Sequence, residues 1–156
     1  MTPVLFADSN VMIEALLIPN SAAYVVAEMV ARGVFDLATC HICIEDTEDA
    51  IVNKLKDNPA ALDETISNWE KLKADTRLVI LPAPDAVLVN ETFHNYLGVM
   101  RHIADIPVLA CALKMEPSPH VILSGNREHF NQKVEERCGI KIFSCQEFIE
   151  FIGDSV

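Results

Sequence analysis

The sequence predicts an α/β fold with three layers, α/β/α, built around a parallel central sheet of short strands. Along all 156 residues, apolar runs of three to five residues alternate with longer segments of helical periodicity. Such alternation implies crossover connections, which place helices on both faces of a parallel sheet. Because 51% of the residues are hydrophobic and no repeat or linker interrupts the pattern, we expect a single domain over residues 1–156.

Five apolar runs are the expected strands, at residues 3–7, 34–38, 78–81, 121–123 and 141–143. The expected helices cover residues 11–17, 21–32, 45–56, 60–72, 85–96, 103–114 and 145–152. Gly33 is a typical C-terminal helix signal, and Asp85 is a typical N-cap. Residues 57–77 fit the sheet pattern least well, and an inserted helical arm is one interpretation of this segment.

Composition excludes several classes of protein. No apolar stretch approaches the ~20 residues that a membrane span needs, so we expect no membrane association. Met1 leads directly into an apolar run without a basic segment, so no export signal is evident. Five cysteines are an odd number, which argues against a disulfide framework. We therefore expect a cytoplasmic location.

Polar residues follow the expected strands. They are Asp8, Ser9 and Asn10 after the first strand, Glu45 and Asp46 after the second, and Ser124, Gly125 and Asn126 after the fourth, with Asp105 opening a buried helix. In a parallel α/β sheet, ligands bind at the carboxyl ends of the strands. Clustered carboxylates repel one another unless a cation neutralises them, so the pattern predicts a Mg²⁺ or Mn²⁺ site. Each acid also has a simpler interpretation, because Asp8 and Asp105 could be helix caps and Glu45 could act only through helix-start electrostatics.

The spacing Cys40-His41-Ile42-Cys43, with Cys138 and Cys145 downstream, raises the alternative of a zinc site. The second pair is six residues apart and has an expected strand between its members. Buried thiols that pack as small apolar side chains are the favoured interpretation.

Four segments resemble, in order, the motifs of the PIN-domain family, whose fold is Rossmann-like. These segments are Phe6–Val11, Ala104–Leu113, Val121–Phe130, and Gly139–Phe143 followed by Glu147-Phe148. The resemblance extends from residue 4 to about residue 152 and is weakest between residues 57 and 100. PIN domains are typically metal-dependent nucleases that act on single-stranded RNA, and many are the VapC-like toxins of toxin–antitoxin pairs.

The resemblance implies roles for individual residues. Asp8, Glu45 and Asp105 would be the catalytic acids and metal ligands. Asp46 stays beside Glu45 as an alternative ligand, because it gives the better helical phase. Asn126 would occupy the fourth acidic position without bringing charge. The residues expected to contact substrate or orient it are Asn10, Ser124, Arg127, His129 and Arg101, with His102 a weaker candidate.

Two functions follow from this resemblance. The first is an Mg²⁺- or Mn²⁺-dependent endoribonuclease, a hydrolase of phosphodiester bonds in single-stranded RNA, restrained by an antitoxin and able to form a homodimer. The alternative is a catalytically weak or inactive PIN-like domain that acts as an RNA-binding or protein-interaction module. Asn126 and the small number of basic residues favour the alternative.

The net charge of −11 appears to count against a nucleic-acid partner. However, residues 1–75 hold 13 acidic and 5 basic residues, whereas residues 76–156 hold 10 and 7, so the second half is much less acidic. We therefore expect RNA contacts from Arg101, Arg127 and Lys133, and binding that depends on metal.

Overall fold

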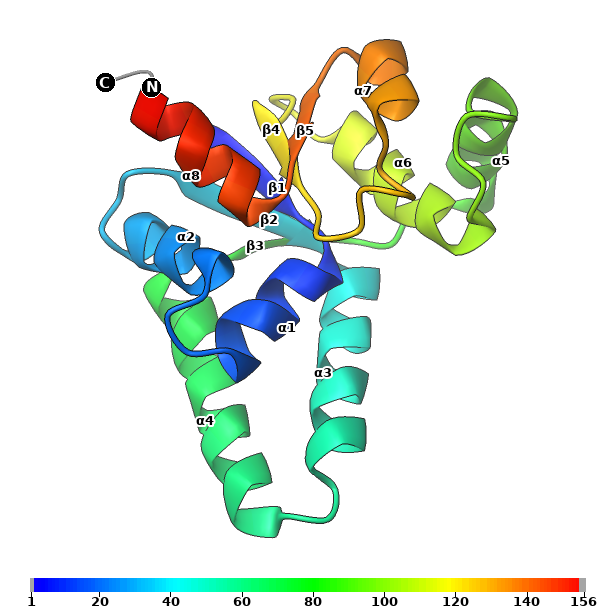
Figure 1. The fold of residues 1–156 in the computed structure, drawn as a ribbon. Coiled ribbons are helices and arrows are strands. Elements are labelled where there is room, and N and C mark those ends of the chain that lie inside the picture. The colour runs from blue at the N-terminus through cyan, green and yellow to red at the C-terminus, as the bar shows by residue number, and fades with distance from the viewer. Residues whose placement is uncertain (1, 155–156) are drawn as a thin grey trace.

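Five parallel strands form one sheet in the order β3-β2-β1-β4-β5, in a computed structural model that describes residues 2–154. The strands are β1 (Val4–Ala7), β2 (Asp36–Cys40), β3 (Val79–Leu81), β4 (Val121–Leu123) and β5 (Lys141–Phe143). The helices are α1 (Ser9–Leu17), α2 (Ala22–Ala31), α3 (His41–Leu55), α4 (Pro59–Asp75), α5 (Ala86–Asn95), α6 (Ile106–Lys114), α7 (Gln132–Cys138) and α8 (Cys145–Asp154). A 3₁₀ turn, η1 (Ile103–Asp105), directly precedes α6. Helices flank the sheet, so the predicted three-layer α/β/α class is confirmed (Figure 1).

The two faces of the sheet bury different side chains because successive residues of a strand point in opposite directions. In β1, Leu5 and Ala7 pack with residues of α1, α2 and α8, whereas Phe6 packs in a second core with residues of α3 and α6. Phe6 and Ala7 are fully buried. Both faces of β1 are covered, which explains why its sequence is continuously apolar.

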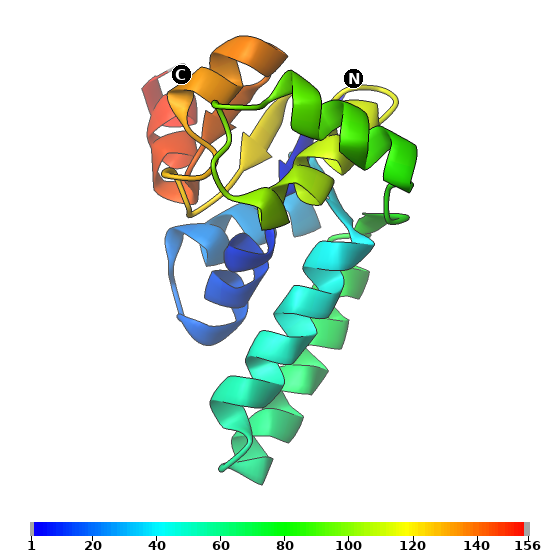
Figure 2. The ribbon, with the colours of Figure 1, turned by 90° about the vertical axis from the view of Figure 1, so that its right-hand side faces the viewer.

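Helices α3 and α4 extend together away from the sheet (Figures 1 and 2). Trp69 of α4 is 2% exposed, and its indole Nε1 donates a hydrogen bond of 3.0 Å to Glu48 Oε2 of α3. The Lys73 ammonium lies 5.0 Å from the centre of the Trp69 ring. Trp69 therefore joins the two helices.

Around residue 40, the end of β2 and the start of α3 differ from the sequence prediction. Helix α3 begins at His41, so the predicted start at residue 45 was wrong, and β2 ends at Cys40 instead of residue 38. Cys40 is the N-cap but makes no side-chain capping bond, and the apolar residues that follow it resemble a continuing strand. Glu45 and Asp46 therefore lie in the second turn of α3, not at its beginning.

Helix α7 was not predicted. Its N-cap Asn131 accepts a hydrogen bond from Val134 N, and Gly139 ends it in the left-handed conformation at φ 74°. Both are recognisable signals. However, Val134 is its only buried residue, so the helix has no apolar stripe to detect.

Among the described residues, no single helix is long and apolar enough to cross a membrane. The pair α1 and α2 reaches the required length and composition only jointly, across a bend of 96°.

Candidate metal centre

The strand order places one pair of strand ends at the middle of the sheet. From β1 the chain builds outward through β2 and β3, then returns to add β4 on the other side of β1. Ligand sites of open α/β sheets form at such a reversal, outside the carboxyl ends of the strands. Asp8 directly follows β1 and Ser124 directly follows β4, so both residues lie at this point.

Asp8 is 6% exposed and has several partners. Its Oδ1 accepts a hydrogen bond from Ser9 N at 2.8 Å, which makes it the N-cap of α1, and its Oδ2 accepts one from Ser124 Oγ at 3.0 Å. Burial raises the pKa of Asp8 in spite of these hydrogen bonds, and the negative charge of Asp105 raises it further. Asp8 is thus both a helix cap and a member of a carboxylate pair with Asp105.

Asn10 fixes the turn after β1 against the turn after β4. Its Oδ1 accepts a hydrogen bond of 2.8 Å from Gly125 N. A Cβ atom at Gly125 would lie 3.3 Å from the same oxygen, so glycine permits this close approach. Asn10 therefore shapes the site through the backbone of the second turn.

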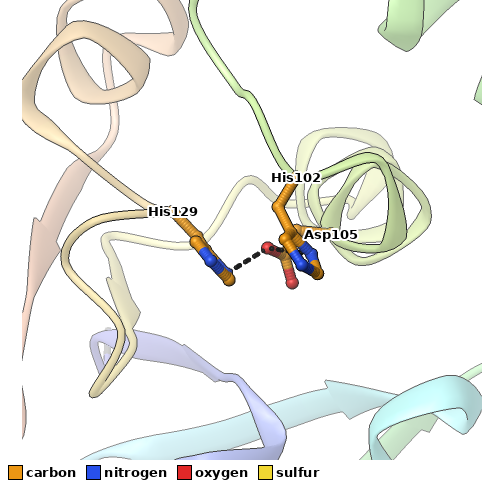
Figure 3. Close-up of side chains that lie close together, drawn as sticks. All are labelled: His102, Asp105 and His129. Atoms are coloured by element: carbon orange, nitrogen blue, oxygen red, sulfur yellow. Dashed lines mark ion pairs between the residues drawn. The ribbon is translucent and has the colours of Figure 1, made fainter.

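Asp105 ends the η1 turn and precedes the first residue of α6. Its side chain caps no helix nitrogen, although it occupies the N-cap position. Its Oδ2 lies 2.6 Å from His129 Nδ1 and 3.6 Å from His102 Nδ1 (Figure 3). Since no described residue donates a hydrogen bond of good geometry to this buried oxygen, Asp105 keeps an acceptor for a cation.

Glu45 and Asp46 have different surroundings. The Glu45 side chain is 62% exposed and pairs with His41 Nε2 at 3.0 Å, one turn earlier on α3. Partial burial raises the pKa of Asp46, and the charges of Asp49, Glu45 and Asp105 raise it further. Asp46 thus lies within the electrostatic reach of Asp105 from α3.

Ser124 and Asn126 lie in the turn after β4. Ser124 is fully buried, and its hydroxyl donates to Asp8 and accepts a hydrogen bond of 3.1 Å from Asn126 N. The Asn126 amide nitrogen lies 2.9 Å from His129 Nδ1. Asn126 therefore adjoins the imidazole that contacts Asp105.

Several solved structures share the fold of this chain. The chain aligns with VapBC2 from Rickettsia felis bound to a promoter DNA fragment, at TM-score 0.60 and 15% identity, over 90% of this chain and 98% of that one. It aligns with FitAcB from Neisseria gonorrhoeae at TM-score 0.65 and 16% identity, over 91% and 98% of the two chains. A structure of FitAB bound to an IR36 DNA fragment gives TM-score 0.57 and 16% identity, over 90% and 94%. The fold is that of a PIN domain. By sequence, no protein-family model and no curated protein matches the chain.

A cavity of about 490 Å³ adjoins Asp105 through the two histidines that contact it, although no candidate metal-binding carboxylate lines it. Arg101 and Lys133 line it together with His102 and His129. Arg127, expected to contact substrate, instead pairs with Glu147 through Nε at 3.1 Å and donates to the Phe130 carbonyl. The basic groups that face the cavity are therefore Arg101 and Lys133, both from the less acidic half of the chain.

The cysteines of the PIN domain do not form the alternative zinc site. Cys40 and Cys43 are fully buried with their sulfur atoms 3.4 Å apart, whereas Cys138 and Cys145 belong to α7 and α8. Among residues 2–154, the one group of three or more metal-ligating side chains close enough to share an ion is His102, Asp105 and His129. Cys43 nevertheless adjoins the site, because its thiol lies 3.8 Å from Asp8 Oδ1, a contact that the sequence did not indicate.

Proposed function

We propose that this PIN domain is a metal-dependent endoribonuclease that hydrolyses single-stranded RNA. One observation carries the proposal: Asp8 lies at the reversal of the strand order, and Asp105 lies close enough for its charge to raise the pKa of this buried carboxyl. Placing like charges together opposes folding, and a structural role for these side chains does not require it. A site for a divalent cation accounts for the pairing.

The donors at the site fit Mg²⁺ or Mn²⁺. Asp8, Asp105 and Asp46 would hold the ion after moving closer together, since the three carboxylates do not by themselves form a group close enough to share one, and the amide oxygen of Asn126 would be a neutral donor. We choose Asp46 over Glu45 because the Glu45 carboxylate is exposed and engaged by His41, whereas the pKa of Asp46 responds to Asp105. When bound, the ion would lower the pKa of a water molecule and neutralise charge on a phosphoryl group.

The residues of the chain contribute positioning and charge. Ser124 holds the Asp8 carboxylate in place through its 3.0 Å hydrogen bond, and Asn10 fixes the turn that carries Asn126. Arg101 and Lys133, on the cavity beside Asp105, would bind phosphates of the RNA. Two basic groups are few for a nucleic-acid site, so we expect weak binding that requires the metal.

A toxin–antitoxin context is supported by the neighbours, which are toxin–antitoxin complexes. We propose that the chain likewise binds an antitoxin protein. The net charge of −11 would suit a basic partner segment.

Cleavage of single-stranded RNA with Mg²⁺ or Mn²⁺ tests the proposal, comparing wild type with Asp8→Asn and Asp105→Asn. Glu45→Gln is a matched control, because it neutralises an acid of the same region that already pairs with His41. We expect cleavage by wild type and the control, and loss in the two aspartate variants. Equal rates in wild type and both aspartate variants would reject the nuclease.

The second candidate is an inactive RNA-binding or protein-interaction module. Asn126 favours it, since an amide in the fourth position brings no charge and its nitrogen already contacts His129. RNA that binds wild type but remains intact at every metal concentration would support this candidate.

A further inference from the structure

We infer that His102, Asp105 and His129 form a transition-metal site, which binds ions such as Co²⁺, Ni²⁺ or Zn²⁺ in preference to Mg²⁺. The inference deepens the proposed function and rests on it in one respect, since Asp105 belongs to both sites. The two histidines would add nitrogen donors to a centre otherwise built from oxygen.

The geometry brings the three side chains together from two segments of the chain. His102 is the N-cap of the η1 turn and Asp105 is its last residue, whereas His129 comes from the loop after β4. Figure 3 shows the Asp105 carboxylate next to both imidazole rings. The rings stack with centroids 4.2 Å apart and planes 13° from parallel. One ligand atom from each side chain lies within 4.8 Å of the others.

These separations suit a bound ion. Bonds of about 2.1 Å in a tetrahedral site place neighbouring ligand atoms about 3.4 Å apart. The Asp105 Oδ2 to His102 Nδ1 distance is 3.6 Å, and the His129 contact would lengthen from 2.6 Å. Because an imidazole binds a metal in the plane of its ring, the two stacked rings would have to turn out of their near-parallel arrangement to share the ion, and both side chains are at least partly exposed.

His129 Nδ1 has two polar neighbours that make different demands on it. Its Nδ1 faces the carboxylate Oδ2 of Asp105 at 2.6 Å and the amide nitrogen of Asn126 at 2.9 Å. A proton on Nδ1 would suit the carboxylate but oppose the amide N–H. A lone pair on Nδ1 would accept from the amide but face the carboxylate charge. A cation between Nδ1 and Oδ2 would bind the single lone pair of a neutral Nδ1 and a lone pair of the carboxylate, and the Asn126 amide would then turn its N–H away from the ring.

The donor types determine which ion is bound. Mg²⁺ prefers an octahedral set of oxygen ligands, whereas imidazole suits Zn²⁺, Ni²⁺ and related ions. Two imidazoles and one carboxylate leave further coordination positions open to water or substrate. His102 and His129 also line the 490 Å³ cavity, so an ion can enter from solvent. The same cavity carries Arg101 and Lys133, which would place a phosphate beside the ion.

Equilibrium dialysis of the full chain against Co²⁺, after removal of metal by a chelator, tests the site. With excess Mg²⁺ present, we expect wild type to bind one Co²⁺ per chain. His102→Asn and His129→Asn should each weaken Co²⁺ binding by at least about tenfold. His94→Asn is the matched control, since His94 lies on α5 against Phe93, away from the site, and should bind as wild type does.

Nuclear magnetic resonance provides a readout that does not depend on activity or affinity. Co²⁺ is paramagnetic and should broaden and shift the imidazole signals of His102 and His129 before those of His94. Absence of Co²⁺ binding in excess Mg²⁺ would overturn the site. Unchanged binding in both histidine variants would overturn it equally, and would leave these rings only as supports for Asp105.

Asp8→Asn separates this inference from the proposed nuclease. The variant removes an oxygen donor but neither histidine, so we expect it to lose RNA cleavage and keep histidine-dependent Co²⁺ binding. Wild type that binds Co²⁺ through the histidines but cuts no RNA would reject the nuclease alone. RNA cleavage with Mg²⁺ by a chain that binds no Co²⁺ would reject the transition-metal site alone.

Discussion

Ser124 Oγ donates a hydrogen bond of 3.0 Å to Asp8 Oδ2 and joins the ends of two neighbouring strands across 116 residues of sequence. Ser124 Oγ also accepts a hydrogen bond of 3.1 Å from Asn126 N. The buried Ser124 hydroxyl thus links the Asp8 carboxylate to the turn that carries Asn126. Partners of metal ligands commonly set their orientation and affinity.

Ser124→Ala should weaken metal binding by roughly 10- to 100-fold, because the Asp8 carboxylate loses a donor that orients it. Titration calorimetry with Mn²⁺ measures this change. Ser21→Ala, at the N-cap of α2, is a control that removes a hydroxyl which accepts a backbone hydrogen bond from Tyr24 N. Equal Mn²⁺ affinity in wild type and Ser124→Ala would contradict the orienting role.

Asp8→Asn should stabilise the metal-free protein at neutral pH. Burial raises the folded-state pKa of Asp8, so its favourable contribution to stability is complete below the unfolded-state pKa and is lost as the pH rises through the folded-state pKa. Asparagine does not titrate, so the amount by which the variant is more stable than wild type should increase from acid to neutral pH. An increase in Tm of about 2–4 °C at neutral pH corresponds to about 1 kcal/mol in a chain of this size.

Thermal unfolding with a chelator present, repeated across the acid range, checks this prediction. Wild type should approach the variant in Tm as the pH falls. A variant that is less stable at neutral pH, or a difference in Tm that does not depend on pH, would show that the Asp8 charge carries no folding penalty.

Asp46→Asn and Glu45→Gln should differ although the two residues are adjacent. We expect Asp46→Asn to reduce metal-dependent RNA cleavage at least tenfold, because it removes charge near Asp105. Glu45→Gln should retain cleavage within about twofold, since an exposed pair with His41 contributes little. Cleavage rates measured over a range of Mn²⁺ concentrations decide between them. The reverse order of effects would restore Glu45 as the ligand.

Replacing Arg101 and Lys133 together by alanine should lower RNA affinity and its dependence on salt. Each lost phosphate contact on a single strand reduces the slope of log K against log salt by about 0.7, so the pair should reduce it by about 1.4. Fluorescence anisotropy in the Asp8→Asn background, which prevents cleavage, measures the slope. Lys54→Ala with Lys56→Ala, both exposed near the outer end of α3, should leave it unchanged.

The central part of the fold could be predicted from sequence because buried parallel strands are continuously apolar. All five strands were predicted within two residues at each end, and Asp85 caps α5 as expected, accepting from Leu88 N at 2.8 Å. The start of α3 could not be predicted, because Cys40 is an unusual cap and Ile42 and Ile44 are compatible with a strand.

The site depended more on tertiary contacts. Asp8 and Ser124 each directly follow a strand. Since ligand sites of parallel sheets form at the carboxyl ends of the strands, the sequence alone could predict that the two residues share a site. The choice between Glu45 and Asp46 depends on where α3 begins, since one residue turns a side chain by about 100° around a helix. The contact of Asp105 with His129 requires the loop after β4 to lie beside η1, and no local pattern encodes that arrangement.

The pairing of β1 with β4 also bears on how the protein is made. Synthesis proceeds from the N-terminus, and β4 ends at residue 123 of 156. A nascent chain can therefore contain Asp8, Asp46 and Asp105 while β1 still lacks the neighbour that completes the site. A product that terminates before β4 should accordingly lack a completed site.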